Sequence, residues 1–213
     1  MNKKKIVKIV LLVILVLILI FISCIIRKMV ILKNLSEKVS QYTNSNNYYE
    51  KIVNNTGTTT EYYRKDNNTV IFITTIVDGK IRKVTKFTKE ENANTYIESG
   101  EDKVALLNSE KGFGEIMIRG LDYNNFLDLF KLALATSIRS EEYNNKQCYV
   151  LSLGNLDEIY REKETGLVVK SKNGIIIDED GNEIDALAEF YYEFNNVNDN
   201  IFIEPDINQY TVR

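Results

Sequence analysis

The chain has 213 residues, and its first 28 positions contain six basic and no acidic side chains, which leaves 21 basic and 30 acidic residues and a net charge of −9 in the remainder. An acidic domain of this kind repels a phosphate backbone, so the composition argues against a nucleic-acid partner. The chain contains no histidine, which excludes nucleophiles activated by histidine and metal sites built on it.

The N-terminal segment predicts a membrane-spanning helix. Between Ile6 and Ile26 the only charged residue is Lys8, and a helix of this length, at about 1.5 Å per residue, spans the roughly 30 Å hydrocarbon layer. Lysines precede the span, and Arg27 and Lys28 follow it. We therefore expect a single-pass anchor, with the short N-terminal tail in the cytoplasm and the remaining residues outside the cytoplasm.

Cys24 raises an alternative interpretation of the same segment. The sequence Phe21-Ile22-Ser23-Cys24 is similar to a lipobox, in which a small residue precedes a cysteine that becomes acylated. Apolar residues continue directly after Cys24, whereas a mature lipoprotein usually begins with a polar tether, and no Ala-x-Ala-like site indicates a cleaved signal peptide. The uncleaved anchor is therefore favoured, and lipidation of Cys24 is the minority alternative.

Residues 29–42 predict an amphipathic helix that continues from the span. Apolar residues recur at spacings of three and four, and polar residues occupy the other side. The polar run Thr-Asn-Ser-Asn-Asn at 43–47 ends this pattern.

The next segments predict β-strands, because they are rich in Tyr, Thr, Val and Ile and are separated by Asn, Asp and Gly. Asp78-Gly79 joins two of them as a two-residue hairpin. The strand 69–77 has apolar residues on both faces, which predicts a central strand covered on two sides. The six predicted strands are Tyr48–Val53, Thr58–Arg64, Thr69–Val77, Lys80–Thr88, Asn94–Glu98 and Lys103–Asn108.

A helix interrupts the strands at Asp122–Ile138, where leucine, phenylalanine and alanine recur at helical spacing. Strand character then returns, with turns at 164–166 and 180–182. Cys148 lies in an apolar run, so we expect it to be a small buried side chain. The four predicted strands are Gln147–Leu153, Asp157–Glu162, Leu167–Lys172 and Glu183–Phe194.

These elements predict an α+β domain over residues 29–213, behind a tail and anchor at residues 1–28. Short turns between successive strands indicate an antiparallel sheet of about 10–11 strands, with one or two helices covering a face. Alternation of strand and helix is absent, which excludes a doubly wound nucleotide-binding fold.

The domain resembles the lipoprotein-carrier superfamily typified by LolA, LolB and RseB. The resemblance covers about residues 30–207 and rests on Tyr-Tyr-Arg-Lys at 62–65, the Asp78-Gly79 hairpin, and a mid-chain helix before the strand 148–153. Arg-Glu-Lys-Glu-Thr-Gly-Leu-Val-Val-Lys at 161–170 is similar to a strand pair of that superfamily, although Val168 stands where a proline is usual. The ending at 194–205 is similar to the closing segment of such proteins.

The resemblance implies a curved, half-barrel-like sheet around helices, with an apolar concavity that accepts acyl chains. The asparagine- and lysine-rich composition suggests a low-GC Gram-positive source, where no outer membrane needs lipoproteins. The resemblance therefore implies the fold and a cavity, and not lipoprotein sorting.

No residue pattern predicts catalysis, a metal site or a cofactor. If Gly181 took the glycine position of a calcium-binding loop, Ile176 and Leu187 would occupy positions that require oxygen ligands. Ser-x-x-Lys does not occur. The adjacent acids Glu141 and Glu142 lie on a segment where neighbouring side chains of a strand would point to opposite faces. We therefore expect a non-enzymatic protein without a metal or cofactor.

Aromatic residues supply the candidate binding site, because many of them fall on the predicted strands. Such side chains line a cavity between sheet and helix, or they simply fill the core. The candidate lining residues are Phe72, Phe87, Phe126, Leu127 and Phe130. The expected function is binding of an apolar ligand, a lipid moiety or an envelope protein by a domain held on the cell membrane. The alternative is a structural or regulatory interaction protein of the cell envelope that has no ligand cavity.

Overall fold

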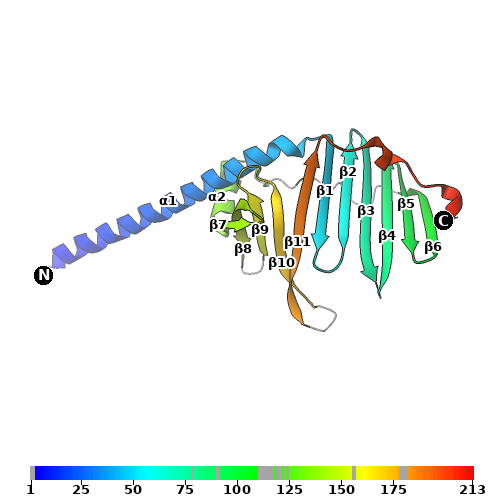
Figure 1. The fold of residues 1–213 in the computed structure, drawn as a ribbon. Coiled ribbons are helices and arrows are strands. Elements are labelled where there is room, and N and C mark those ends of the chain that lie inside the picture. The colour runs from blue at the N-terminus through cyan, green and yellow to red at the C-terminus, as the bar shows by residue number, and fades with distance from the viewer. Residues whose placement is uncertain are drawn as a thin grey trace.

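The computed structural model describes residues 3–77, 79–89, 92–109, 118, 121, 123, 125–154, 157–177 and 182–213. It is an α+β structure in which a long N-terminal helix, α1 (Lys3–Thr43), leads into a curved, open antiparallel sheet (Figure 1). The predicted anchor and the predicted amphipathic helix are thus one continuous helix. Within the described residues, α1 is the one helix long and apolar enough to cross a membrane.

α1 has two parts with different surroundings. The side chains from Lys5 to Cys24 are all exposed, whereas from Ile25 onward a stripe of side chains is buried against the domain. The stripe repeats every three or four residues, as expected for one face of a helix. Its buried members are Ile25, Met29, Leu32, Leu35 and Val39. The amphipathic pattern is therefore confirmed, and the packing begins inside the predicted span, at Ile25.

The described strands form one sheet of twelve, in the order β12-β6-β5-β4-β3-β2-β1-β11-β10-β9-β8-β7. All neighbours are antiparallel except β12 and β6, which are parallel. The strands are β1 (Asn47–Asn54), β2 (Thr59–Lys65), β3 (Asn68–Val77), β4 (Lys80–Lys89), β5 (Asn92–Ser99), β6 (Asp102–Ser109), β7 (Thr136–Tyr143), β8 (Lys146–Leu153), β9 (Asp157–Glu162), β10 (Val168–Ile177), β11 (Glu183–Phe194) and β12 (Thr211–Val212).

The mid-chain helix is shorter than predicted. α2 spans Phe126–Ala135, and the Asn125 side chain caps it by accepting a hydrogen bond from the Asp128 backbone N–H at 3.0 Å. Thr136 and Ile138, assigned to the helix by their spacing, begin β7 instead. This edge strand escaped prediction because most of its side chains are exposed and polar, so no apolar alternation marks it. Asp122, the predicted helix start, lies outside the described residues.

The two faces of the sheet are covered by different segments (Figure 1). On one face, α1 and α2 pack against β7 and β8, and the last turns of α1 pack against β11 and β1–β3. On the other face, at the far end of the sheet, two short 3-10 helices, η1 (Asp199–Phe202) and η2 (Ile207–Gln209), cover β3–β6. Val70 and Ile71, adjacent on β3, are both buried, in the clusters on opposite faces. This confirms the central position of that strand, although its distal end at Ile76 and Val77 is exposed.

Two predicted turns include residues that are not described. β3 and β4 pair through Val77 and Lys80, which confirms the hairpin, while Asp78 itself lies outside the described residues. The predicted turn at 180–182 falls in the sequence between β10 and β11, but positions 178–181 lie outside the described residues, and these include Gly181 of the rejected calcium loop.

Candidate functional site

The five candidate lining residues do not lie in one place. Phe72 and Phe87 belong to the apolar cluster beneath η1 and η2, whereas Phe130 packs in the cluster between α1, α2 and β8. Phe126 and Leu127 are exposed on α2. The sequence could not show that these residues belong to different clusters, because an apolar side chain on a strand or a helix can pack on either face of the sheet.

The two cysteines occupy different environments. Cys148 is fully buried on β8 within an apolar cluster, as predicted, and burial raises the pKa of its thiol. Cys24 is exposed on α1, immediately before Ile25, where packing against the domain begins. Lipidation of Cys24 stays a prediction. An acylated Cys24 would hold the domain at the same position as the uncleaved helix.

A cleft opens in the sheet where β11 continues beyond the end of its pairing with β10. β11 pairs with β10 as far as Glu189, opposite Lys170, and pairs with β1 as far as Phe194. In the described part of the chain, the segment 190–194 therefore has a strand neighbour on one side only. Beside this segment lies a cleft of about 460 Å³, which we call the β11 cleft.

Several elements converge on the β11 cleft, so its lining combines aromatic rings with charged groups. α1 contributes Tyr42, whose ring lies 4.7 Å from that of Phe194 on β11. The β7–β8 turn and the β9–β10 turn supply the opposite wall. The lining residues are Tyr42, Tyr49, Tyr143, Asn144, Lys146, Glu162, Thr165, Leu167, Val169, Glu189, Phe190, Tyr191, Tyr192, Glu193 and Phe194.

The charged groups of the β11 cleft are mostly acidic. Two tyrosine hydroxyls, those of Tyr143 and Tyr191, donate to the Glu189 carboxylate, the latter at 2.6 Å. Glu162 accepts from the Thr165 hydroxyl at 2.7 Å and pairs with Lys146 at 3.3 Å. With Glu193, three carboxylates face one ammonium group in the lining. The cleft therefore favours cationic and aromatic groups and disfavours anions.

Hydrogen bonds between tyrosine and glutamate shift pKa values in opposite directions. The hydroxyls of Tyr143 and Tyr191 stabilise the ionised form of Glu189 and lower its pKa. Burial, followed by the hydrogen bond to Glu189, raises the pKa of Tyr143 to about 12. The same pattern recurs on the far strands, where Tyr210 lowers the pKa of Glu98, and burial with that hydrogen bond raises the pKa of Tyr210 to about 12.

These shifts predict that stability is lost on both sides of a plateau. The lowered pKa values of Glu98 and Glu189 give stability that is present above the ordinary value of 4.5 and is lost as the pH falls through the folded-state values. The raised values of Tyr143 and Tyr210 give stability that is present below 10.0 and is lost as the pH rises through about 12. Urea titrations should give a plateau in the free energy of unfolding between about pH 5 and pH 10. A continued rise toward pH 11 would contradict the assigned tyrosine contacts.

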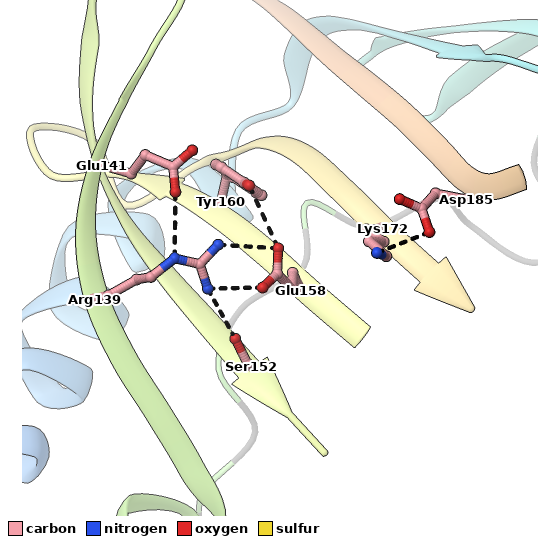
Figure 2. Close-up of polar contacts among 7 residues, drawn as sticks. All are labelled: Arg139, Glu141, Ser152, Glu158, Tyr160, Lys172 and Asp185. Carbon is pink, nitrogen blue, oxygen red and sulfur yellow. Dashed lines mark hydrogen bonds and ion pairs between the residues drawn. The ribbon is translucent and has the colours of Figure 1, made fainter. Parts of the chain in front are cut away.

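A polar network covers the outer face of β7–β9, close to the sheet edge (Figure 2). The Arg139 guanidinium makes a bidentate contact with Glu158, with Nη1–Oε1 at 2.7 Å and Nη2–Oε2 at 3.0 Å. Its Nε donates to Glu141 at 3.3 Å, and Nη1 also donates to Ser152 at 3.3 Å. Arg139 lowers the pKa of Glu158 by this hydrogen bonding. Every nitrogen of the guanidinium has a partner within the protein.

Further along the same face, Lys172 on β10 pairs with Asp185 on β11 at 2.8 Å (Figure 2). Glu142, next to Glu141 in the sequence, accepts instead from Gln147 at 2.9 Å. The adjacent acids thus point to opposite faces, as expected for a strand. The charged groups of Arg139, Glu141, Glu158, Lys172 and Asp185 are thus matched with one another, so these contacts stabilise neighbouring strands.

Replacing Arg139 should have a small effect. The Arg139→Met variant loses the pair with Glu158, and because the arginine side chain is about half exposed we expect the free energy of unfolding to fall by about 0.2–1 kcal/mol. Chemical denaturation in low and high salt measures this. A loss of several kcal/mol would mean that the network holds the edge strand in place.

The residues of the β11 cleft were not identified from the sequence. One signal was present: the predicted strand Glu183–Phe194 is twice as long as its predicted neighbour Leu167–Lys172. A strand that extends beyond its partner leaves backbone N–H and C=O groups unpaired on that side. The aromatic and acidic run from Phe190 to Phe194 lies in this overhang.

Comparisons with known proteins give limited similarity. No protein-family model matches the chain, and no curated protein sequence matches it. The structure is similar to an uncharacterized conserved protein from Thermus thermophilus, at 12% identity and a TM-score of 0.46, over 85% of this chain and 98% of that chain. It is also similar to MucB, in the crystal structure of MucB in complex with MucA(peri), at 11% identity and a TM-score of 0.32, over 79% of this chain and 57% of that chain. Similarity at this level assigns no family, so the resemblance to lipoprotein carriers stays a prediction.

Proposed function

We propose that the chain is a single-pass membrane protein whose non-enzymatic domain lies outside the cytoplasm and binds a segment of another envelope protein in the β11 cleft. The observation that carries the proposal is the overhang of β11 at 190–194, which pairs with β1, has no second strand neighbour among the described residues, and borders a cleft of about 460 Å³.

The membrane part of the proposal is supported by the exposed half of α1. Its mean hydropathy reaches 3.8 over a window of the helix, and large apolar side chains from Ile6 to Ile22 are exposed throughout. Such a surface is stable in lipid and would aggregate in water. Because Ile25 already packs against the domain, the sheet lies close to the bilayer and not on a long tether.

The binding part is supported by the chemistry of the β11 cleft. Where a strand extends beyond its neighbour, an extended segment can add to the sheet through main-chain hydrogen bonds, and the adjoining pockets then select its side chains. Here the half-exposed ring of Tyr191 and the carboxylates of Glu189 and Glu193 suit a basic or aromatic side chain.

A lipid or fatty-acid ligand fits this geometry less well. The space between α2 and the sheet is occupied by an apolar cluster that includes Leu129, Ala133 and Leu151. The β11 cleft carries three carboxylates, which repel a fatty-acid carboxylate or an anionic headgroup. These features favour a protein partner over a carried lipid.

Site-specific photo-crosslinking in living cells tests the proposal. A photoreactive amino acid replaces Tyr191 in the β11 cleft, and a matched control replaces Ile81, an exposed residue of β4 distant from the cleft. We expect one discrete protein adduct from position 191 and none from position 81. The charge reversal Glu193→Lys, at an exposed position, should weaken binding of the purified partner by about tenfold or more.

Other outcomes would contradict the proposal. Adducts of lipid mass from position 191 would indicate an apolar ligand. Equal labelling from positions 191 and 81 would mean that the β11 cleft has no partner of its own. An affinity unchanged by Glu193→Lys would place the interface elsewhere on the domain.

A further inference from the structure

α2 lies at the end of the domain that follows the exposed half of α1. Figure 1 shows α2 and β7 at the side of the sheet nearest the N-terminal half of that helix. The contact begins at Ile25, one residue before the predicted span ends at Ile26, and continues through Met29 and Leu32. α2 is therefore held beside the turns of α1 that leave the hydrocarbon layer.

Lys28 fixes this position. Its ammonium donates to the Ala133 carbonyl at 3.3 Å and to the Thr136 carbonyl at 2.7 Å, at the C-terminal end of α2. A cation at this end also complements the negative pole of the helix. The two helices are thus joined by the hydrogen bonds of Lys28 and by the buried contact of Leu129 and Ala133 with α1.

The outer side of α2 is apolar, in contrast to an ordinary surface helix. Phe126, Leu127 and Leu134 are 74%, 56% and 47% exposed, and Phe130 is half-buried. At about 100° per residue these four side chains lie within an arc of roughly 100°, next to the buried side of the helix. On α1, Ile26 and Val30 are exposed as well, so apolar surface runs from the span on to the beginning of the domain.

Basic residues border this surface. Arg27 is exposed on α1, and Lys131 is exposed on α2 beside the apolar side chains. An amphipathic helix with phenylalanine and leucine on one side and lysine at its border lies in the plane of a membrane interface. Exposed apolar residues at this level would face the boundary between headgroups and acyl chains.

We infer that α2 is a second membrane contact, which inserts Phe126, Leu127 and Leu134 into the leaflet next to the domain. The inference rests on the proposed membrane anchoring of α1. The contact fixes the rotation of the domain about α1, because two elements in lipid define an orientation that one helix leaves free. The occupant of the apolar surface is lipid, and neither a second copy of the chain nor a ligand.

Depth-dependent fluorescence quenching on the full chain tests the inference. The variants carry Cys24→Ser, and the remaining native cysteine, Cys148, is buried and does not react with the dye. An environment-sensitive dye is attached to the cysteine of Leu127→Cys. Ile81→Cys, 57% exposed on β4, is the matched control. The proteins are placed in vesicles of phosphatidylcholine and phosphatidylglycerol with or without lipids that bear a nitroxide on the acyl chain. We expect emission at position 127 to fall by about half or more, and emission at position 81 to be unchanged.

Three results would overturn the inference. The first is emission at position 127 that is insensitive to the nitroxide lipids while the protein floats with the vesicles, which leaves the anchoring intact. The second is a disulfide-linked dimer through Leu127→Cys, which would mean that a second copy covers α2. The third is failure of the full chain to float with the vesicles at all, and this result would refute the proposed anchoring together with the inference.

Discussion

The Gly166→Ala variant should lose about 2–5 kcal/mol of its free energy of unfolding, as the sum of about 1–2 kcal/mol for a left-handed alanine and about 1–3 kcal/mol for overpacking. Gly166 has a φ of +75°, and a Cβ there would lie 2.6 Å from the Leu35 carbonyl oxygen and 3.1 Å from the Val39 nitrogen. These atoms belong to the backbone of α1, so relief requires the whole helix to move. Pulse proteolysis of the full chain in detergent and urea measures the loss.

Gly57→Ala is the matched control for this prediction. Gly57 has a φ of +80°, but no atom lies within 4 Å of the position that a Cβ would take. Its loss should therefore be limited to the conformational cost of about 1–2 kcal/mol. Equal losses in the two variants would contradict the close approach of α1 to the turn at Gly166.

The Leu32→Ala variant should lose about 2–5 kcal/mol of the free energy of unfolding. Leu32 is 0% exposed, and it belongs to the apolar cluster that also contains Leu129 on α2 and Leu151 on β8. Removing its side chain leaves a cavity where the anchor helix meets the domain. Urea titration followed by pulse proteolysis in detergent micelles gives the difference from the unmodified protein.

Val30→Ala is the matched control, because Val30 lies two residues earlier on the opposite side of α1. It shows how much of the loss in Leu32→Ala comes from buried packing and how much from a change in helix propensity. Val30 is 61% exposed, so its truncation should change the free energy of unfolding by about 0.5 kcal/mol or less in micelles. If Leu32→Ala were as mild as Val30→Ala, the second half of α1 would be a linker rather than part of the core.

Local signals explain which parts of the fold were predictable. The hairpin between β3 and β4 and the turn before β10 follow from glycine at positions of positive φ, Gly79 and Gly166. The buried stripe from Met29 to Val39 was predictable because polar residues lie between its apolar members in the sequence. Ile25 belongs to the same stripe, but it lies in an uninterrupted apolar run, where no polar contrast reveals a buried face.

Other parts depend on contacts between distant residues, which periodicity does not report. The cover of Val70 and Phe87 by the C-terminal 3-10 helices joins segments more than a hundred residues apart. The edge strand β7 carries few apolar side chains, and its pairing with β8 is fixed by the β7–β8 turn, where Asn144 and Asn145 both have positive φ. The candidate lining residues were plausible by composition, but their division between clusters follows from the sheet order.

Those distant contacts also create the β11 cleft. Its walls come from α1, the two turns at Asn144 and Thr165, and β11, and none of these segments is adjacent in the sequence. Of the features that form this cleft, the overhang of β11 alone could have been predicted from the lengths of the predicted strands. Its neighbours become apparent only when the order β1-β11-β10 is known.

The proposed function requires the domain to lie outside the cytoplasm behind a membrane-spanning α1. Maleimide labelling of intact cells tests this directly, with a bulky, membrane-impermeant reagent and a single reactive cysteine at Ile81 in a Cys24→Ser background, where the buried Cys148 stays unreactive. We expect full labelling without permeabilising the inner membrane, on a protein that stays in the membrane fraction after alkaline extraction. Labelling only after lysis would contradict the placement outside the cytoplasm, and release of the protein by alkali would contradict the membrane-spanning α1.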